Sequence, residues 1–265
     1  MAHEVNDSGR AVRALLVFIS FCFASSAAYI VNDVVDAPHD KRHRSKRRRP
    51  IAANEISRRA ALMIVPVAAI ASLAIAASIS RETLFGVVLY LVLSALYTLL
   101  VKRLVLADVI LLAGFYSLRV LIGGAATGIV VSRWLLAFSS FLFISLSLAK
   151  RYADLSRAAA EDEEAPGGRA YTTGDREVLL GLGTSSGLIS VLVFALYLNS
   201  SQVTKLYSKT DPLWLVCALL VYWIGRMWLL AHRGQLDDDP IVTATTDPAS
   251  YIVAAAAAVI VVASI

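Results

Sequence analysis

The sequence predicts an all-α integral membrane protein that crosses the bilayer eight times. Of the 265 residues 58% are hydrophobic, and the mean hydropathy is +0.68. Only 17% of residues are charged, against roughly 25% in soluble domains. Several apolar runs reach about 17–22 residues, enough to cross about 30 Å of hydrocarbon. A soluble helical protein is excluded because 60–79 and 254–265 are apolar on every side.

The first half of the chain holds four apolar runs with charged or polar residues between them. The first run ends at Asn32-Asp33, and the second begins at Arg58-Arg59 after a long charged loop. Ser80-Arg81 separates the second run from the third, and Lys102-Arg103 forms a tight turn before the fourth. We expect membrane spans at about 11–31, 58–79, 82–101 and 104–124.

The second half repeats this pattern with longer polar connections. The segments 150–176 and 232–248 are polar, and so is the shorter 199–211 on the other side. The last run continues to Ile265 and is barely long enough to span. We expect spans at about 133–149, 177–198, 212–231 and 249–265.

Lys and Arg are distributed unequally between the two sides of these spans. The side that carries the loop 32–57 holds seventeen of them, and the other side holds six. By the positive-inside rule the loop 32–57 is cytoplasmic, and both chain ends face outward. The net charge of +5 therefore reports topology and a local ligand charge, and nucleic-acid binding is not expected.

Three carboxylates follow the first span, at Asp33, Asp36 and Asp40. If the helix continued they would share one face, at positions i, i+3 and i+7. Such a face can hold Mg²⁺ through one or two direct bonds, with water and substrate phosphates completing the shell. Pro38 predicts that the helix kinks or ends near Asp36, which would leave Asp40 on an irregular segment. The alternative is a solvated helix end whose acids pair with the following cations.

Seven Lys or Arg residues lie within 41–49, directly after these acids. Topology or anionic lipid would explain the run without any site. Beside three carboxylates, phosphate binding by some of its members is the sharper interpretation.

A second cluster, Lys150-Arg151-Tyr152-Ala153-Asp154, follows the fifth span. It again places cations, an aromatic hydroxyl and a carboxylate at a membrane edge. Acidic residues at 161–164 and 237–239 also lie in the loops of this side, where a solvated acidic run is the simpler reading.

Several polar side chains fall within the spans or at their ends. An ionisable group inside a bilayer is costly and usually faces a cavity. Arg119 is the clearest example because it lies well inside the fourth span, whereas Arg226 has the alternative of extending to the inner interface. The others of this kind are Asp108, Tyr116 and Tyr97.

The chain resembles the UbiA superfamily of intramembrane prenyltransferases. The motifs that carry this resemblance run through most of the chain: Asn32-Asp33-x-x-Asp36-x-x-x-Asp40, Lys46-Arg47-Arg48-Arg49-Pro50-Ile51-Ala52, Tyr97 to Lys102-Arg103, Arg119 to Gly123-Gly124, and Lys150-Arg151-Tyr152-Ala153-Asp154. Members that transfer phosphoribosyl groups to decaprenyl phosphate are the most similar, since they carry Lys-Arg-Tyr-Ala-acid at the second cluster. Aromatic prenyltransferases carry a further Asp four residues on, where this chain has Ala158.

The resemblance implies a single transmembrane domain over 1–265, built as a UbiA-like helix bundle. The family has nine helices around a cavity that opens to the cytoplasm, and its first helix has no counterpart among the eight spans. We therefore expect a chain that is truncated at its N-terminus, in agreement with the outward N-terminus.

The activity implied is Mg²⁺-dependent phosphoribosyl transfer from 5-phosphoribosyl diphosphate to a polyprenyl (decaprenyl) phosphate, for synthesis of cell-envelope arabinan precursors. The enzyme would lie in the bacterial plasma membrane with its site facing the cytoplasm. The partners are thus a polyprenyl lipid and a phosphorylated small-molecule donor. The resemblance assigns metal binding to Asp33, Asp36 and Asp40, catalysis to Asp33, Asp36, Lys150, Tyr152 and Asp154, and substrate binding to Asn32, Lys46, Arg47, Arg49, Lys102, Arg103, Arg119 and Arg151.

Two alternatives stay open. The first acidic motif would equally serve a prenyltransferase that moves a polyprenyl group from its diphosphate to an aromatic acceptor. A non-catalytic membrane protein or transporter is an alternative of another class, favoured by the missing helix and disfavoured by the three intact aspartates.

Overall fold

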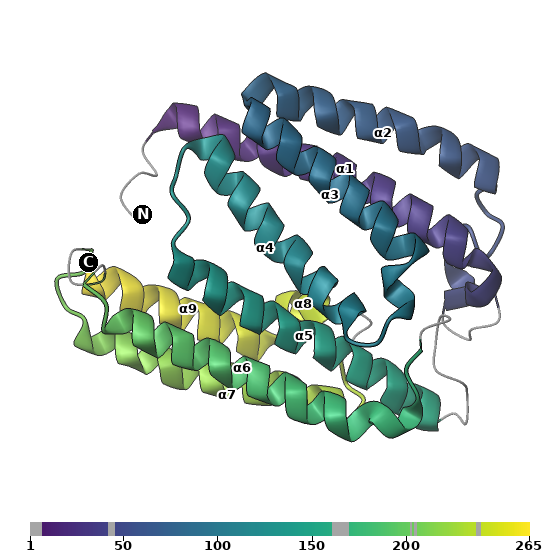
Figure 1. The fold of residues 1–265 in the computed structure, drawn as a ribbon. Helices are drawn as coiled ribbons and strands as arrows, with labels where there is room; N and C mark the ends of the chain where they lie inside the picture. Colours follow the sequence, from purple (N-terminus) through teal and green to yellow (C-terminus); the bar gives the residue numbers. More distant parts are fainter. Residues whose placement is uncertain (1–6, 42–45, 161–169, 202, 204–205, 237–239) are drawn as a thin grey trace. The chain divides into compact units, whose positions relative to one another are not determined.

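The helices of the chain fall into two compact units in the computed structural model (Figure 1). The structure describes residues 7–41, 46–160, 170–201, 203, 206–236 and 240–265. Within these residues all regular secondary structure is helical. Helices α1 to α4 belong to the first unit, and α5 to α9 belong to the second.

The first unit contains four long helices. Each of the first three begins at a polar N-cap, Asp7, Ser57 or Ser80, whose side chain accepts hydrogen bonds from the backbone of the first turn. The bounds are α1, Ser8–Asp40; α2, Arg58–Ile79; α3, Arg81–Leu99; and α4, Ala107–Thr127.

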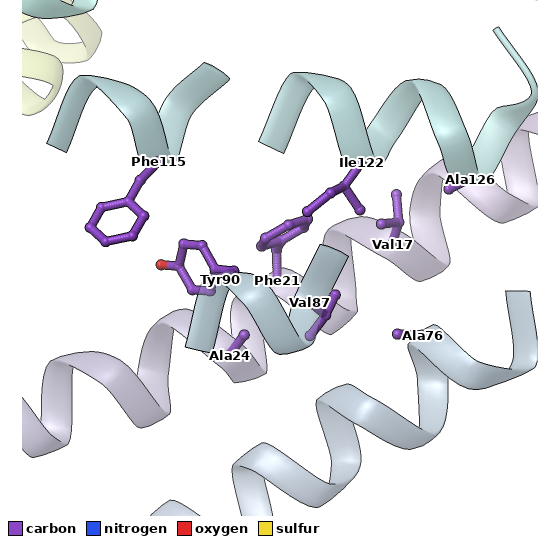
Figure 2. Packing of buried hydrophobic residues seen from close by; sticks show 9 residues of the cluster. All are labelled: Val17, Phe21, Ala24, Ala76, Val87, Tyr90, Phe115, Ile122 and Ala126. Carbon is purple, nitrogen blue, oxygen red and sulfur yellow. The ribbon is translucent and has the colours of Figure 1, made fainter. Parts of the chain in front are cut away.

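Aromatic rings and small residues fill the core of this unit (Figure 2). Tyr90 of α3 lies between Phe21 of α1 and Phe115 of α4, with both ring centroids 5.3 Å away in edge-to-face geometry. Ser20 and Ser72 join α1 to α2, because each hydroxyl donates to the other residue's backbone carbonyl at 2.8 Å. The helices thus approach closely through small and hydroxyl side chains, as is usual in membranes.

The second unit is organised around Trp228. A Cβ added at Gly183 would lie 2.1 Å from the Trp228 ring, so only glycine allows this approach. The indole nitrogen donates to the Ser145 hydroxyl at 3.0 Å, and that hydroxyl donates to the Gly183 carbonyl at 2.7 Å. The bounds are α5, Arg133–Ala160; α6, Arg176–Leu198; α7, Trp214–His232; α8, Pro240–Thr246; and α9, Pro248–Ser264.

The predicted spans correspond to helices, and the protein is an all-α integral membrane protein. Seven helices of the described chain are long and apolar enough to cross a bilayer, and α9, at 17 residues, is shorter. Large apolar side chains such as Phe18, Met63 and Phe85 are 65–70% exposed, a surface suited to lipid and not to water. The short helix α8 lies where the sequence predicted a loop.

Candidate active site

Two of the three predicted metal ligands converge on a single cation at the end of α1. Arg49 Nη1 lies 3.0 Å from Asp33 Oδ1 and 3.0 Å from Asp40 Oδ2. Asp33 and Asp40 are seven residues apart, two helical turns, so their carboxylates lie on the same side of α1. One guanidinium nitrogen therefore marks the point where the two carboxylates meet.

The prediction that α1 ends near Asp36 is wrong, because the helix continues through Pro38 to Asp40. Pro38 lacks the amide hydrogen that would bond to the carbonyl four residues earlier. Tertiary contacts offset this loss. Ala37 is fully buried against Ile51, and the Asp40 side chain, only 5% exposed, is paired with Arg49.

Asp36 takes a different partner. Its carboxylate pairs with the ammonium of Lys102, in the 3-10 turn Val101–Arg103 that follows α3. Both side chains are largely buried, at 15% and 5% exposed. The fixed charges of α1 are thus matched by cations from two segments that are far apart in the sequence.

The other predicted substrate-binding residues near this cluster are more accessible. Arg47 and Arg103 are exposed, and Asn32 is half-buried. Lys46 begins the 3-10 turn Lys46–Arg48, but its side chain lies outside the described residues, as do residues 42–45.

Arg119 lies in the middle of α4, among hydroxyls and aromatic rings. Its Nη2 donates to the Tyr90 hydroxyl at 2.9 Å and to the Ser25 hydroxyl at 3.2 Å. The guanidinium carbon lies 5.3 Å from the Tyr90 ring centroid and 5.2 Å from that of Tyr116. Arg119 thus contacts side chains of α1, α3 and α4, and its role in substrate binding stays a prediction.

The carboxylates of α1 have the chemistry that Mg²⁺ requires. In the part of the chain that the structure describes, no three His, Cys, Asp or Glu side chains stand together as a ready-made metal site. Mg²⁺, however, is usually held by one or two carboxylates plus substrate phosphates. Asp33 and Asp40 already surround a positive centre at 3.0 Å, and Asp36 lies on the turn between them. This donor set fits Mg²⁺ delivered with a diphosphate.

The second cluster, on α5, has the opposite charge balance. Asp154 accepts from Arg151 Nη1 and from Arg157 Nη2, both at 3.3 Å. Ala158 occupies the position one turn later and is buried. A single carboxylate shared by two guanidiniums offers little to a metal ion, whereas guanidiniums bind phosphate well.

Tyr152 has a partner that the sequence analysis did not assign. Its hydroxyl lies 2.8 Å from His232 Nδ1 at the end of α7, and the two rings are stacked. The Trp228 ring meets Tyr152 edge-on, with centroids 6.0 Å apart. Two side chains of α7, His232 and Trp228, therefore hold the Tyr152 ring in place. Lys150, two residues earlier on α5, is half-buried. The sequence feature that could have pointed to this partner is the position of His232 at the end of a predicted span.

The partly exposed side chain of Arg226 forms an ion pair with Asp247. It donates to both carboxylate oxygens of Asp247, at 2.7 and 3.2 Å. Asp247 also caps α9 by accepting from the Ser250 amide. The hydrogen bond from Arg226 holds the pKa of Asp247 below its ordinary value. The Arg226–Asp247 ion pair therefore connects α7 to α9.

The acidic runs at 161–164 and 237–239 lie outside the described residues.

Comparison with known proteins places these features in a family context. The chain is 35% identical to the uncharacterised protein y4nM of Sinorhizobium fredii over 92% of this chain and 48% of that protein. It is 32% identical to the nodulation protein NoeC of Azorhizobium caulinodans over 89% of this chain and 76% of that protein. It is 34% identical to the decaprenyl-phosphate phosphoribosyltransferase of Mycobacterium tuberculosis over 54% of this chain and 47% of that enzyme. It thus spans about half the length of two of these relatives.

Solved structures agree on the fold. A UbiA homologue from Archaeoglobus fulgidus, bound to geranyl diphosphate (GPP) and Mg²⁺, superposes with a TM-score of 0.70 at 17% identity. The match covers 96% of this chain and 89% of the homologue. The family model described as the UbiA prenyltransferase family matches residues 1–246. The chain is therefore a member of the UbiA prenyltransferase family, with the family's transmembrane helix bundle.

Proposed function

We propose that this protein transfers the phosphoribosyl group of 5-phosphoribosyl diphosphate to a polyprenyl phosphate such as decaprenyl phosphate. The observation that carries this proposal is the α5 cluster, in which Asp154 is shared by Arg151 and Arg157 and the next turn holds Ala158. Arginines placed in this way bind a substrate phosphate directly, whereas a second pair of acids would call for a second metal. The decaprenyl-phosphate phosphoribosyltransferases named above support the same choice.

The α1 cluster is assigned to the leaving group. When bound there, Mg²⁺ neutralises charge on the departing diphosphate. Asp33, Asp36 and Asp40 would hold the metal, and Arg49 and Lys102, which pair with these acids, would donate to the phosphates. Asn32, Lys46, Arg47 and Arg103 add to the same binding surface.

The reaction exchanges one oxygen for another at the ribose C1. The bond from C1 to the diphosphate oxygen breaks, and its electron pair leaves with diphosphate. An oxygen of the polyprenyl phosphate forms the new bond to C1. That oxygen is already anionic at neutral pH, so the transfer needs no general base. Lys150, Tyr152 and Asp154 are assigned to orienting the phosphates, with Tyr152 held in place by His232.

The acceptor lipid determines the setting of this chemistry. A polyprenyl tail requires apolar surroundings, so its phosphate reaches the protein at the membrane edge. The excess of Lys and Arg supports a cytoplasmic position for this edge, and the membrane we assign is a bacterial plasma membrane. The product would be a polyprenyl-linked pentose phosphate for the cell envelope.

Prenyl transfer to an aromatic acceptor is the second candidate. The homologue solved with geranyl diphosphate and Mg²⁺ favours it, as does the presence of the first acidic motif. The absence of a second acid after Asp154 disfavours it.

A direct assay separates the two. The protein, purified in detergent with Mg²⁺, is offered labelled phosphoribosyl diphosphate with polyprenyl phosphate. In parallel it is offered polyprenyl diphosphate with 4-hydroxybenzoate. We expect labelled lipid in the first reaction and none in the second. Product in the second reaction alone would refute the proposal, and no product in either would support a non-catalytic membrane protein.

A further inference from the structure

The Arg119 cluster lies well away from the carboxylates in the first unit. Ser25 precedes Asp36 on α1 by eleven residues, three full turns, so both lie on one face of that helix, about 16 Å apart. Arg119 itself is twelve residues inside α4, about 18 Å from the helix start. Its guanidinium is therefore inside the bilayer, where a charge is costly without compensation.

No carboxylate compensates this charge within the described part of the chain. The contacts of Arg119 are the hydroxyls of Ser25 and Tyr90 and the rings of Tyr90 and Tyr116. These groups orient the guanidinium but do not neutralise its charge. Both hydrogen bonds use Nη2, so the other N–H donors of the guanidinium can bind a ligand. Arg119 and Ser25 are only partly buried. The local chemistry is that of a receptor for an anion.

Aromatic residues connect this cluster with the carboxylates. Phe115 lies one turn before Arg119 on α4 and contacts Tyr90 and Tyr97 edge-on, with centroids at 5.3 and 6.1 Å. Figure 2 shows Phe115 and Tyr90 side by side. Tyr97 precedes the turn that carries Lys102, the partner of Asp36. From the Asp36–Lys102 pair inward, the interior of the first unit thus holds aromatic rings and then, in the middle of α4, the guanidinium of Arg119.

We propose that Arg119, with Ser25 and Tyr90, binds the 5-phosphate of the donor, while the diphosphate of the same molecule binds at Asp36. This inference rests on the proposed function. A phosphoribosyl diphosphate has an anionic group at each end of its ribose, and the first unit offers two sites for anions along one face of α1. The site recognises a phosphate monoester. The acceptor lipid also carries such a group, so the two sources must be separated by experiment.

Binding measurements in detergent test this without turnover. The probes are phosphoribosyl diphosphate, ribose 5-phosphate, inorganic diphosphate and farnesyl phosphate, each with Mg²⁺. We expect Arg119→Gln to weaken phosphoribosyl diphosphate and ribose 5-phosphate by about tenfold to a hundredfold and to leave inorganic diphosphate and farnesyl phosphate unchanged. Asp36→Asn should do the reverse, weakening diphosphate and leaving ribose 5-phosphate unchanged.

Matched variants keep the test informative if Arg119→Gln folds poorly. Arg119→Lys keeps the charge but loses the fork, and Tyr90→Phe keeps the ring but loses the hydroxyl. Both should weaken ribose 5-phosphate selectively, by about threefold to tenfold. Arg226→Gln removes another arginine from a span, one that is paired with Asp247, and should leave all four affinities unchanged.

The outcomes separate this inference from the proposed function. If the unaltered protein binds phosphoribosyl diphosphate and Arg119 variants bind ribose 5-phosphate normally, the inference is wrong and the function stands. Selective loss of farnesyl phosphate would assign the site to the acceptor and also overturn it. If the unaltered protein binds neither ribose compound, both fail.

Discussion

The α1 and α5 clusters use the same kinds of side chain in opposite proportions. On α1, three carboxylates share Arg49 and Lys102. On α5, one carboxylate is shared by Arg151 and Arg157. The described pairs of α1 contain three acids and two cations, a balance that suits a metal cation. The described pairs of α5 contain one acid and two cations, a balance that suits a phosphate.

This difference shows why an acidic motif at a membrane edge does not by itself define a metal site. Asp36 and Asp154 are both paired with cations, but among the described residues Asp36 pairs with Lys102 alone and has Asp33 and Asp40 on the same helix, whereas Asp154 is held between two arginines. The partners of a carboxylate, and not its presence, decide which ligand it can take. Substitutions at Asp36, at the two arginines of α5 and at Gly183 test this contrast, and one at Asp247 gives a reference outside it.

The largest effect is expected at Asp36. Asp36→Asn should lower the transfer rate by about a hundredfold or more, since a metal ligand is lost. It should also destabilise the protein by about 3–5 kcal/mol, because Lys102 stays buried without its partner. Transfer assays and thermal unfolding in detergent measure the two effects.

The double variant Asp36→Asn with Lys102→Met separates them. It should recover most of the thermal stability, since no buried charge remains unpaired, and should stay inactive. Glu82→Gln, which removes an exposed carboxylate from α3, is the control and should change neither. Recovery of activity in the double variant would contradict a metal role for Asp36.

The next effect distinguishes the two arginines of α5. The Arg151 side chain is 3% exposed and that of Arg157 is 38% exposed. Arg151→Gln should raise the KM of the phosphorylated substrate bound at α5 about tenfold to a hundredfold, whereas Arg157→Gln should raise it only a few-fold, because water screens an exposed charge. The Mg²⁺ concentration for half-maximal activity should not change in either variant. Equal effects of the two, or a shift in the Mg²⁺ requirement, would undermine the phosphate assignment.

A smaller effect is expected from packing in the second unit. Gly183→Ala places a methyl group against the Trp228 ring, which contacts Tyr152. We expect a loss of about 1–3 kcal/mol of stability and weaker donor binding, with Mg²⁺ binding unchanged. Gly181→Ala is the matched control on the same helix, since nothing lies within 4 Å of its added Cβ. Equal unfolding temperatures of the two variants would show that Trp228 can move aside.

The smallest effect concerns acid stability outside both clusters. Arg226 lowers the pKa of Asp247, so the folded state favours the carboxylate. This contribution is complete above the unfolded pKa of about 3.9 and is lost as pH falls through the lower folded value. Asp247→Asn should therefore lower Tm by about 2–4 °C at neutral pH and flatten its decline below about pH 4. Asp211→Asn, at an exposed position, should keep the shape of the unaltered curve.

The helices and the first motif were predictable because their signals are local. Apolar runs long enough to cross a bilayer identified the spans, and the spacing of Asp33, Asp36 and Asp40 identified a shared face. Pro38 misled the prediction, since burial of Ala37 outweighs one lost hydrogen bond. Helix α8 was missed because seven residues are too few to show a period.

The pairings were not predictable, because they join distant segments. Asp36 meets Lys102 across 66 positions, and Tyr152 meets His232 across 80. Arg49 could be foreseen near Asp40 from the short loop, but its choice of Asp33 as a second partner depends on the helical turn. Likewise, the charge of Arg226 was visible in the sequence, and its acid was not.

The reciprocal hydrogen bonds of Ser20 and Ser72 have a consequence for biosynthesis. They join the first two helices of the described chain, and Arg49 lies in the connection between these helices. A hairpin of α1 and α2 can therefore satisfy its own polar groups and neutralise Asp33 and Asp40 before later helices are made. Asp36 alone must wait for Lys102. The order of translation thus partly neutralises the acidic end of α1 from the start, which lowers the cost of bringing it to the membrane.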